Sequence, residues 1–448
     1  MKTIVEEKPI SFKELEQKIF SYVCELGREI TTAMLEAYDK ELAEGRDKKN
    51  YRDKGIRTTT IKTVYGEVSY GRHVYQTKLE DGKKACVYLL DEAMQMEKIG
   101  LISTNLAEKL AMTVTEAPYR VTAETISSTC GQSISAGGVW NVMQRLGERI
   151  SEEEEHAVKQ MHADQSEGKK EIPVLFEEMD GVWLSMQDEQ HKKMKKQEMK
   201  VFTMYEGWDE EKEKQGRSSL VGKTMLAGME NSKKFHEKRE ACICKKYDAD
   251  EIGQRILNGD GGSWIYEPYD PEAIFQLDRY HVYQEITGKI RDKKAQREIR
   301  ELFDTGKPEE MLEYIQIYAT SVESPDEKDK SSQKAWELYQ YLERNREGLL
   351  PYDKRGIKIA APPEGILYKR MGVQENQNCT VITLRMKNRR MRWSVNGANN
   401  LAKILYQKEN KELIETIERY TDGLVFTMQM QEIVETLSAA KAPKKDGK

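Results

Sequence analysis

The sequence is poor in the residue types that build disulfide frameworks and zinc sites. Its 448 residues include only six cysteines and six histidines, and both are scattered along the chain. Only Cys242 and Cys244 lie close together, and a C-x-C pair without further ligands is a weak zinc signal. The cysteines are therefore expected to be reduced thiols that build neither a disulfide framework nor a metal site.

Long apolar runs are also absent from the sequence. No segment approaches the roughly 18 consecutive apolar residues of a membrane-spanning helix. The N-terminal sequence, MKTIVEEKPISFKELEQ, contains no apolar stretch of the signal-peptide type. We therefore expect a cytoplasmic protein with no membrane partner.

The charge is nearly balanced overall but uneven along the chain. Hydrophobic residues account for 38% of the sequence and charged residues for 33%, and the net charge is −5. This composition is typical of a soluble chain, and the length predicts about two to four folded units. The negative net charge excludes a uniformly basic nucleic-acid binder, yet residues 376–408 contain no acid. This basic stripe, expected to contact phosphates, comprises Arg385, Lys387, Arg389, Arg390, Arg392, Lys403 and Lys408.

Residues 1–50 predict an N-terminal helical region. Apolar side chains recur with helical spacing between residues 11 and 46, and Ser11 with Glu14 makes a capping box at the start. The expected apolar side of this helix comprises Leu15, Ile19, Phe20, Val23 and Leu26.

Residues 51–100 predict a basic β-hairpin region. Residues 51–78 alternate in polarity and contain a Tyr65-Gly66 turn, which is typical of a hairpin. Basic residues outnumber acidic ones there, and Arg52 and Arg57 are candidates for contact with phosphates.

Residues 101–155 are expected to be helical. Within them, residues 118–150 predict two helices joined by a short turn at Cys130-Gly131, and Ser133 or Ser135 would cap the second helix. This pattern is typical of a DNA-binding helix-turn-helix, although any helical hairpin has the same appearance. The expected packing face of the second helix comprises Val139, Trp140, Val142, Met143 and Leu146.

The pattern changes to an α/β core from Ile172 onward. Residues 171–290 and 356–410 predict the two parts of a mixed sheet, and residues 291–355 predict a charged helical insertion between them. Residues 411–448 predict a C-terminal helix and a basic tail. The expected strands are 172–179, 182–187, 199–206, 219–228, 255–257 and 273–278, with a helix at 231–245.

Two acids stand out because each follows a short apolar run and precedes glycine and then tryptophan. They are Asp180 and Asp260, and both are expected where a strand ends. Carboxylates placed there are rigid and face the loops in which ligands gather. Two such carboxylates from neighbouring strands would share a pair of Mg²⁺ or Mn²⁺ ions if a third acid closed the site.

The third acid lies downstream of the insertion. Glu375 and Glu364 both satisfy the spacing, and periodicity does not separate them. Glu177 and Glu178 precede Asp180 and also compete, because strand alternation puts Glu178 on the same face as Asp180.

Four motifs make the chain resemble a known family. They are EMDGVW (178–183), GDGGSWI (259–265) with the LDRYH that follows, GVQENQN (372–378) and RMKNRRMRWS (385–394). On these motifs the chain resembles bacterial insertion-sequence transposases of the ISLre type, distant relatives of the Mutator-like DDE enzymes. The likeness covers most of the chain, from GEVSYGRHVYQ to WSVNGANN.

The resemblance implies a fold, a reaction and a set of site residues. The fold would be an α/β RNase H-like core interrupted by a helical insertion, and Asp180, Asp260 and Glu375 would be the DDE triad. Glu375 is preferred over Glu364 because a G-x-x-E followed by a basic helix resembles the last motif of the related families. The reaction would be two-metal cleavage and transfer of double-stranded DNA at element ends, by a homodimer or larger complex associated with the nucleoid.

The resemblance also suggests accessory and DNA-binding residues. His281 resembles the histidine that follows the second acid in Mutator-like enzymes, and Asp278 would share a helix face with it. If Glu375 begins a helix, Arg385, Arg389 and Arg392 share one side of that helix and follow the DNA backbone. The neighbouring Arg390 is also expected to bind DNA.

Two other classes of function stay open. One is a DNA-binding regulator with an inactive RNase H-like fold, although three intact acids argue against it. The other is a carboxylate-based hydrolase such as a glycosidase, which has no need of an arginine-rich segment.

Overall fold

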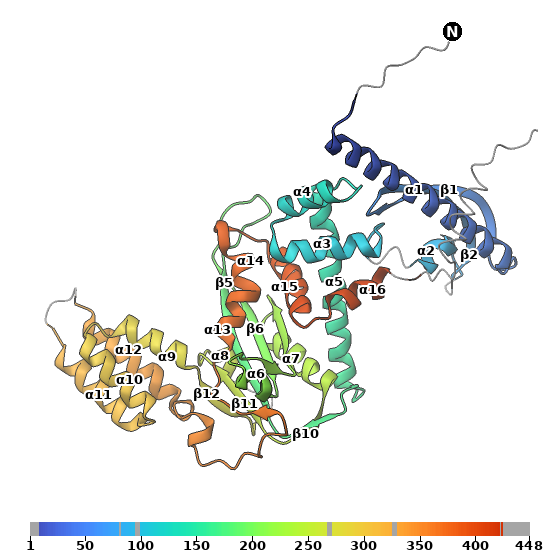
Figure 1. Cartoon of the computed structure of the whole chain (residues 1–448). Helices are drawn as coiled ribbons and strands as arrows, with labels where there is room; N and C mark the ends of the chain where they lie inside the picture. The colour runs from blue at the N-terminus through green and yellow to red at the C-terminus, as the bar shows by residue number, and fades with distance from the viewer. Residues whose placement is uncertain are drawn as a thin grey trace, which may run out of the picture. The chain divides into compact units, whose positions relative to one another are not determined.

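The computed structural model describes residues 9–79, 82–94, 99–266, 271–324, 329–421 and 423. The chain forms two compact units, one of Met1–Arg149 with Lys411–Lys448 and one of Ile150–Asn410 (Figure 1). Helix α5 (Ala136–His162) begins in the first unit and ends in the second. Among the helices of the described residues, none is both long and apolar enough to cross a bilayer.

A three-stranded antiparallel sheet lies in the first unit. Strands β1 (Arg52–Thr63) and β2 (Gly66–Lys78) pair as the expected hairpin, with Thr63 opposite Gly66 at the turn. Strand β3 (Lys84–Val87), which the sequence pattern did not predict, extends the sheet beside β2. Arg52 and Arg57 lie in the exposed half of β1.

Helix α1 (Phe12–Gly45) packs on this sheet through its C-terminal half. The capping box is confirmed, since the Glu14 N–H donates to Ser11 Oγ at 3.3 Å. Asp39 in the C-terminal half is buried and accepts the His73 N–H at 3.1 Å. The expected apolar residues of the N-terminal half are largely exposed instead, with Ile19 54% exposed.

The remaining helices of the first unit include the expected helical pair. Ser135 Oγ, one of the two serines expected for this role, caps α5 by accepting the Gly138 N–H at 3.1 Å. Trp140 does not join the packing face of α5, because it is 43% exposed while Val139 and Met143 are buried. The helices of this unit are α2 (Leu89–Ala93), α3 (Thr104–Glu116), α4 (Tyr119–Thr129), the start of α5, and α16 (Leu413–Thr421).

A five-stranded mixed sheet forms the centre of the second unit, in the order β12-β11-β5-β6-β9. Strand β6 is antiparallel to both of its neighbours, β5 and β9, whereas β5, β11 and β12 run parallel to one another. Their bounds are β5 (Leu175–Leu184), β6 (Gln197–Tyr205), β9 (Thr224–Gly228), β11 (Arg255–Gly259) and β12 (Ile274–Leu277).

The expectation of two separate strands on either side of Asp180 is wrong. Strand β5 continues through Gly181, which stays paired with Lys200 on β6. The Glu198 side chain occupies the space where a Cβ on Gly181 would lie. Glycine is therefore used here for close approach within a strand, not to end it.

Helices cover both faces of this sheet. One face carries Met179 and packs on α7 (Ser232–Lys246), whose Arg239 donates to Met179 Sδ at 3.2 Å. The other face carries Glu178 and Asp180 and packs on α13 (Gln374–Gln377). Alternation along β5 thus sends Met179 and Asp180 into different layers.

Shorter elements complete the second unit. Helix α15 (Val395–Glu409) packs on the edge strand β9, where Lys403 Nζ donates to the Ala227 carbonyl at 3.0 Å. The other short elements are α6 (Glu210–Lys214) and α8 (Ser263–Tyr266), the parallel pair β4 (Lys170–Ile172) and β10 (Tyr247–Ile252), and the antiparallel set β13 (Ile366–Leu367), β7 (Gly207–Asp209) and β8 (Leu220–Val221).

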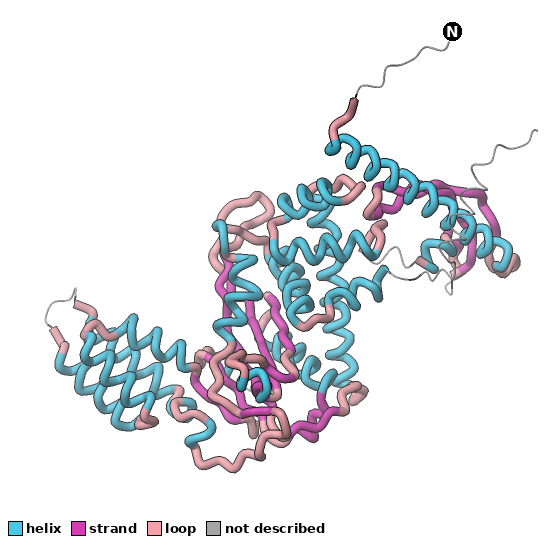
Figure 2. The backbone as a smooth tube through the Cα atoms, viewed as in Figure 1, coloured by secondary structure: helices cyan, strands magenta, loops and turns pink. Residues whose placement is uncertain are grey.

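The segment between β12 and α13 contains the expected helical insertion, drawn as a group of helices in Figure 2. Its helices share a core that includes Ile286, Ile299, Ile315 and Leu338. The helices are α9 (Arg279–Lys289), α10 (Lys293–Asp304), α11 (Pro308–Ser321) and α12 (Ser331–Arg344), followed by 3-10 turns at Arg346–Gly348 and Tyr352–Lys354.

Candidate metal centre

Asp180 is the central acid of the candidate site. It lies on β5, the middle strand of the sheet, and is 6% exposed. Its Oδ1 accepts the Gly181 N–H at 2.7 Å, and its Oδ2 accepts Asn378 Nδ2 at 2.6 Å. His281 Nε2 lies 3.4 Å from the same Oδ2. These contacts fix the orientation of the carboxylate.

Glu375 reaches Asp180 because Glu178 anchors the start of α13. The fully buried Glu178 carboxylate accepts the backbone N–H groups of Gly372 at 3.0 Å, Val373 at 3.2 Å and Gln374 at 3.1 Å. A carboxylate binds a helix N-terminus because the N–H groups there have no partner within the helix. Burial raises the pKa of Glu178, against the hydrogen bonds that favour its charged form. Glu178 is therefore the anchor of the helix that carries Glu375.

His281 is directed toward Asp180 by the start of α9. Asp278 is the N-cap of this helix, and its Oδ1 accepts the His281 N–H at 3.1 Å. Burial of His281 opposes its protonation, but the hydrogen bond and charge of Asp180 outweigh burial and raise its pKa to about 9. Asp180 thus favours the charged form of the imidazole. Asp278 acts through the helix and not as a further ligand in this group.

Three side chains form a group with metal-ligand spacing. One ligand atom each from Asp180, His281 and Glu375 lies within 4.8 Å of the other two. The expected proximity of Glu375 to Asp180 is therefore observed. Burial and then the charge of Asp180 raise the pKa of Glu375, which means that the two carboxylates repel each other.

Asp260, the expected second acid, is not a member of this group; it follows β11 and is close enough for the charges of Asp180 and His281 to affect it. Its Oδ1 accepts the Gly262 N–H at 2.8 Å, and its carbonyl accepts the Tyr341 hydroxyl at 2.8 Å. Gly261 adopts φ +77° with Asn345 against it, so that a Cβ would not fit. Burial raises the pKa of Asp260, and the charge of Asp180 adds to this shift.

The donor set fits a divalent cation. Mg²⁺ and Mn²⁺ take carboxylate oxygens, and Mn²⁺ also accepts an imidazole nitrogen. Asp180, Asp260 and Glu375 bring negative charges together at the edge of a buried region, and the charge of Asp180 raises the pKa of the other two. A divalent ion would relieve that repulsion.

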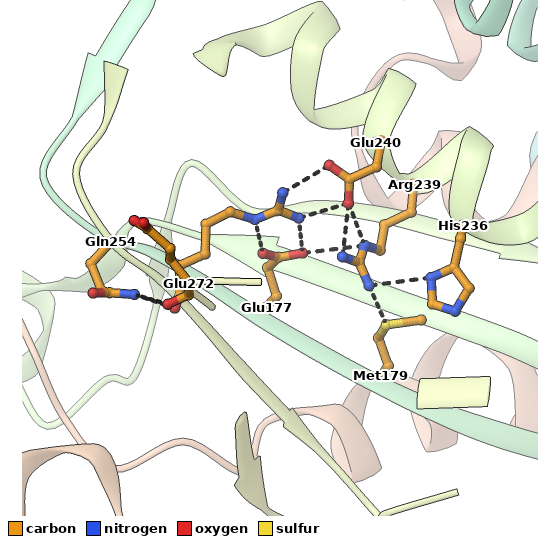
Figure 3. A network of polar contacts seen from close by, with 8 residues as sticks. Glu177, Met179, His236, Arg239, Glu240, Gln254 and Glu272 are labelled. Carbon is orange, nitrogen blue, oxygen red and sulfur yellow. Dashed lines mark hydrogen bonds and ion pairs between the residues drawn. The ribbon is translucent and has the colours of Figure 1, made fainter. Parts of the chain in front are cut away.

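The other acids near Asp180 have structural partners. Glu177 points to the opposite face of the sheet, where Arg255 Nε and Nη2 donate to it at 2.6 and 2.9 Å (Figure 3). Arg255 also binds Glu240 at 2.8 Å, and Arg239 binds Glu240 at 2.7 Å. These ion pairs join β5 to β11 and so set the relative register of the two strands that carry Asp180 and Asp260. Glu364 is exposed and lies next to β13, outside the group of metal-ligand spacing.

Sequence reasoning missed two contributors to the site. Asn378 holds Asp180 and is itself held by Gln374 Nε2, which donates to Asn378 Oδ1 at 2.9 Å. The spacing of four residues in QENQN was a signal for this pair. Glu198 was the second omission. Burial raises the pKa of its carboxyl, and the charges of Asp260 and Asp180 raise this pKa further, whereas the hydrogen bond with Trp264 lowers it.

Residues 5–419 match the uncharacterised protein family UPF0236. The chain belongs to the UPF0236 family. It is 26% identical over 407 residues to the UPF0236 protein in the vanSb 3' region of Streptococcus gallolyticus, covering 89% of this chain and 83% of the relative. It is 24% identical over 418 residues to a UPF0236 protein of Caldanaerobacter subterraneus subsp. tengcongensis, covering 91% and 81%.

The basic stripe of this UPF0236 member does not form the expected helix. The helix that starts at α13 continues through a π-helical turn (Asn378–Thr383) and α14 (Leu384–Met386) and then ends. Arg390 has φ +55°, Met391 is extended, and Trp393 forms a β-bridge with Met186. The prediction that Arg385, Arg389 and Arg392 share one helical side is therefore wrong.

Arg385 is also unsuited to the predicted DNA contact. It is 5% exposed, its Nη1 lies 3.7 Å from Met391 Sδ, and its guanidinium lies over the Trp393 ring. This packing makes it a structural residue of the fold. Arg390 and Arg392 are exposed, and the side chain of Arg389 lies outside the described part of the chain.

Proposed function

We propose that this UPF0236 protein is a metal-dependent DNA transposase that cleaves and transfers strands at the ends of an insertion sequence. The observation that carries the proposal is the convergence of Asp180, Glu375 and His281, with Asp260 beside them. These residues come from four separate segments of the chain, and the convergence of acids on one face of a sheet is suited to two-metal phosphoryl transfer. The resemblance of the motifs around them to DDE transposases supports the same reaction.

The architecture of the second unit supports an RNase H-like core. Its mixed sheet carries the first acid on the central strand, the second after a parallel neighbour, and the third after a helical insertion. That is the arrangement implied by the resemblance, in which a catalytic sheet is interrupted before its last acid.

Residues of the chain hold the proposed site in place. Asn378 fixes one oxygen of Asp180, Glu178 fixes the helix of Glu375, and Asp278 directs His281. Asp180, Asp260 and Glu375 would hold two Mg²⁺ or Mn²⁺ ions, which would supply positive charge for the attacking and the leaving oxygen. A preformed set of ligands reduces the reorganisation needed when DNA arrives.

Double-stranded DNA is the proposed partner. Arg52 and Arg57 on β1 and Arg390 and Arg392 of the basic stripe are exposed cations suited to phosphates. The α4–α5 pair is the proposed reader of bases. Because two element ends must be joined, the working form would be a homodimer or larger.

The test is strand cleavage of DNA that carries the element's own ends, with Mg²⁺ or Mn²⁺. Asp180→Asn, Asp260→Asn and Glu375→Gln should each abolish cleavage and strand transfer but leave DNA binding largely intact. Glu364→Gln is the matched control and should stay active. Specific DNA binding without cleavage under any divalent metal would instead favour an inactive regulator.

A further inference from the structure

A polar pocket lies between two helices of the insertion and adjoins the candidate metal centre. Helix α9 lines it with His281, Glu285 and Lys289, which recur every four residues along one side. Helix α12 lines it with Glu337, Gln340, Tyr341 and Arg344. Asp260 and His281 belong to both the pocket and the candidate site.

The two helices are amphipathic in a way that keeps this pocket polar. Val282 and Ile286 of α9 and Leu338 and Leu342 of α12 are buried in the core of the insertion. The pocket-lining residues of each helix are next to these buried residues in sequence. They therefore lie at the border of the core, and their side chains are polar. The pocket is a feature of the packed insertion and does not depend on a single loop.

Most polar groups of the pocket already have partners. Lys289 Nζ lies 3.0 Å from Glu285 and 4.0 Å from Glu337. The Tyr341 hydroxyl donates to the Asp260 carbonyl at 2.8 Å, which attaches α12 to the loop that carries this acid. Arg344 lies one helical turn after Tyr341.

Arg344 is an exposed cation near the end of α12. Within the ranges that the structure describes, it forms no ion pair, whereas Arg346 two residues later binds both Glu309 and Glu343. A guanidinium presents several N–H donors in a plane that match two oxygens of a phosphate. Arg344 is thus a free phosphate-binding group near Asp260.

We propose that this pocket binds the DNA strand that is cut at the metal centre, with Arg344 on a phosphodiester next to the scissile one. The inference rests on the proposed function and adds a substrate contact from the helical insertion. Because Tyr341 ties α12 to the Asp260 loop, Arg344 holds the neighbouring phosphate at a set distance from that acid. Such a contact fixes register along the strand without reading its sequence.

The test compares full-length variants in binding to a fluorescently labelled random-sequence DNA duplex, with Ca²⁺ replacing Mg²⁺. Arg344→Ala should bind about tenfold more weakly, and its slope of log affinity against log salt should fall by about one. Arg344→Lys should keep most of that slope because it keeps the charge. Arg346→Ala is the matched control and should bind like the wild-type chain. Arg344 is exposed, so its variants are expected to fold, which the unfolding temperature checks.

The outcomes separate this inference from the proposed function. If the wild-type chain does not bind DNA, both fail. If it binds and Arg344→Ala matches Arg346→Ala, the inference alone is overturned. In the cleavage assay, Arg344→Ala should raise KM with little change in kcat. If inorganic phosphate displaced DNA more strongly than chloride at equal ionic strength in the wild type but not in Arg344→Ala, the pocket would be a site for free phosphate and the inference would also fall.

Discussion

Replacing Glu178 by glutamine tests how the third acid is brought to the site. The carboxylate accepts three backbone N–H groups at the start of α13, together with the Tyr205 hydroxyl at 2.6 Å and Asn258 Nδ2 at 3.2 Å. All of these partners are donors. Glutamine has nearly the same shape, but its NH₂ group would face donors where an oxygen now accepts.

The expected cost follows from the donors that lose their acceptor. The Oε2 atom serves two of them, the Gln374 N–H and Asn258 Nδ2. Each buried donor left without an acceptor costs about 1–3 kcal/mol, so Glu178→Gln should lower the free energy of unfolding by about 2–6 kcal/mol. The exposed Glu364→Gln should change it by less than about 0.5 kcal/mol.

Urea unfolding measures the stability change, and amide hydrogen exchange locates it. The amides of Gly372, Val373 and Gln374 should exchange faster in Glu178→Gln, while strand β5 stays protected because its ladder is untouched. Wild-type exchange at these amides would refute the role of Glu178 as the anchor of α13.

Two further predictions concern stability. Burial disfavours charge on Glu230, but Lys403 and Lys238 outweigh it and lower its pKa from 4.5 to about 2. The carboxylate therefore stabilises the fold above pH 4.5 by about 3 kcal/mol, and this stabilisation is lost as the pH falls from 4.5 toward 2. The free energy of unfolding in urea should therefore change less between pH 7 and pH 3 in Glu230→Gln than in the wild-type chain. An equal change in the two proteins would contradict the role of Glu230. Gly181→Ala should displace the Glu198 side chain and lower the free energy of unfolding by about 1–3 kcal/mol. Gly288→Ala, in open space on α9, should be neutral or stabilising. Equal melting temperatures of these two variants would count against close packing at Gly181.

Local patterns predicted the elements whose formation depends on nearby residues. The hairpin follows from alternation around a turn, and the start of α1 follows from Ser11 and Glu14, which lie within one helical turn. The placement of Asp180 in an apolar strand follows from its flanking residues, but the expected end of the strand at Asp180 does not, because β5 continues to Leu184. Each of these inferences uses residues close together in the sequence.

Sequence patterns could not predict contacts between segments that are far apart in the chain. Glu178 was a competing metal ligand on alternation alone, and only the approach of residues 372–374, far along the chain, makes it a helix anchor. Arg385 lies in an arginine-rich segment and was therefore predicted to contact DNA. The helix ends at Met386, however, and the chain then turns back so that Trp393 packs beside Arg385. Periodicity describes a helix only as far as the helix continues.

Binding of Mn²⁺ to the full chain tests the central claim most directly, because it needs no knowledge of the DNA ends. Electron paramagnetic resonance of free Mn²⁺ gives the affinity during titration. We expect the wild-type chain and Glu364→Gln to bind Mn²⁺ alike, and Asp180→Asn to bind it at least about tenfold more weakly. Wild-type affinity in Asp180→Asn, or loss of binding in Glu364→Gln, would contradict a metal centre built on Asp180, Asp260 and Glu375.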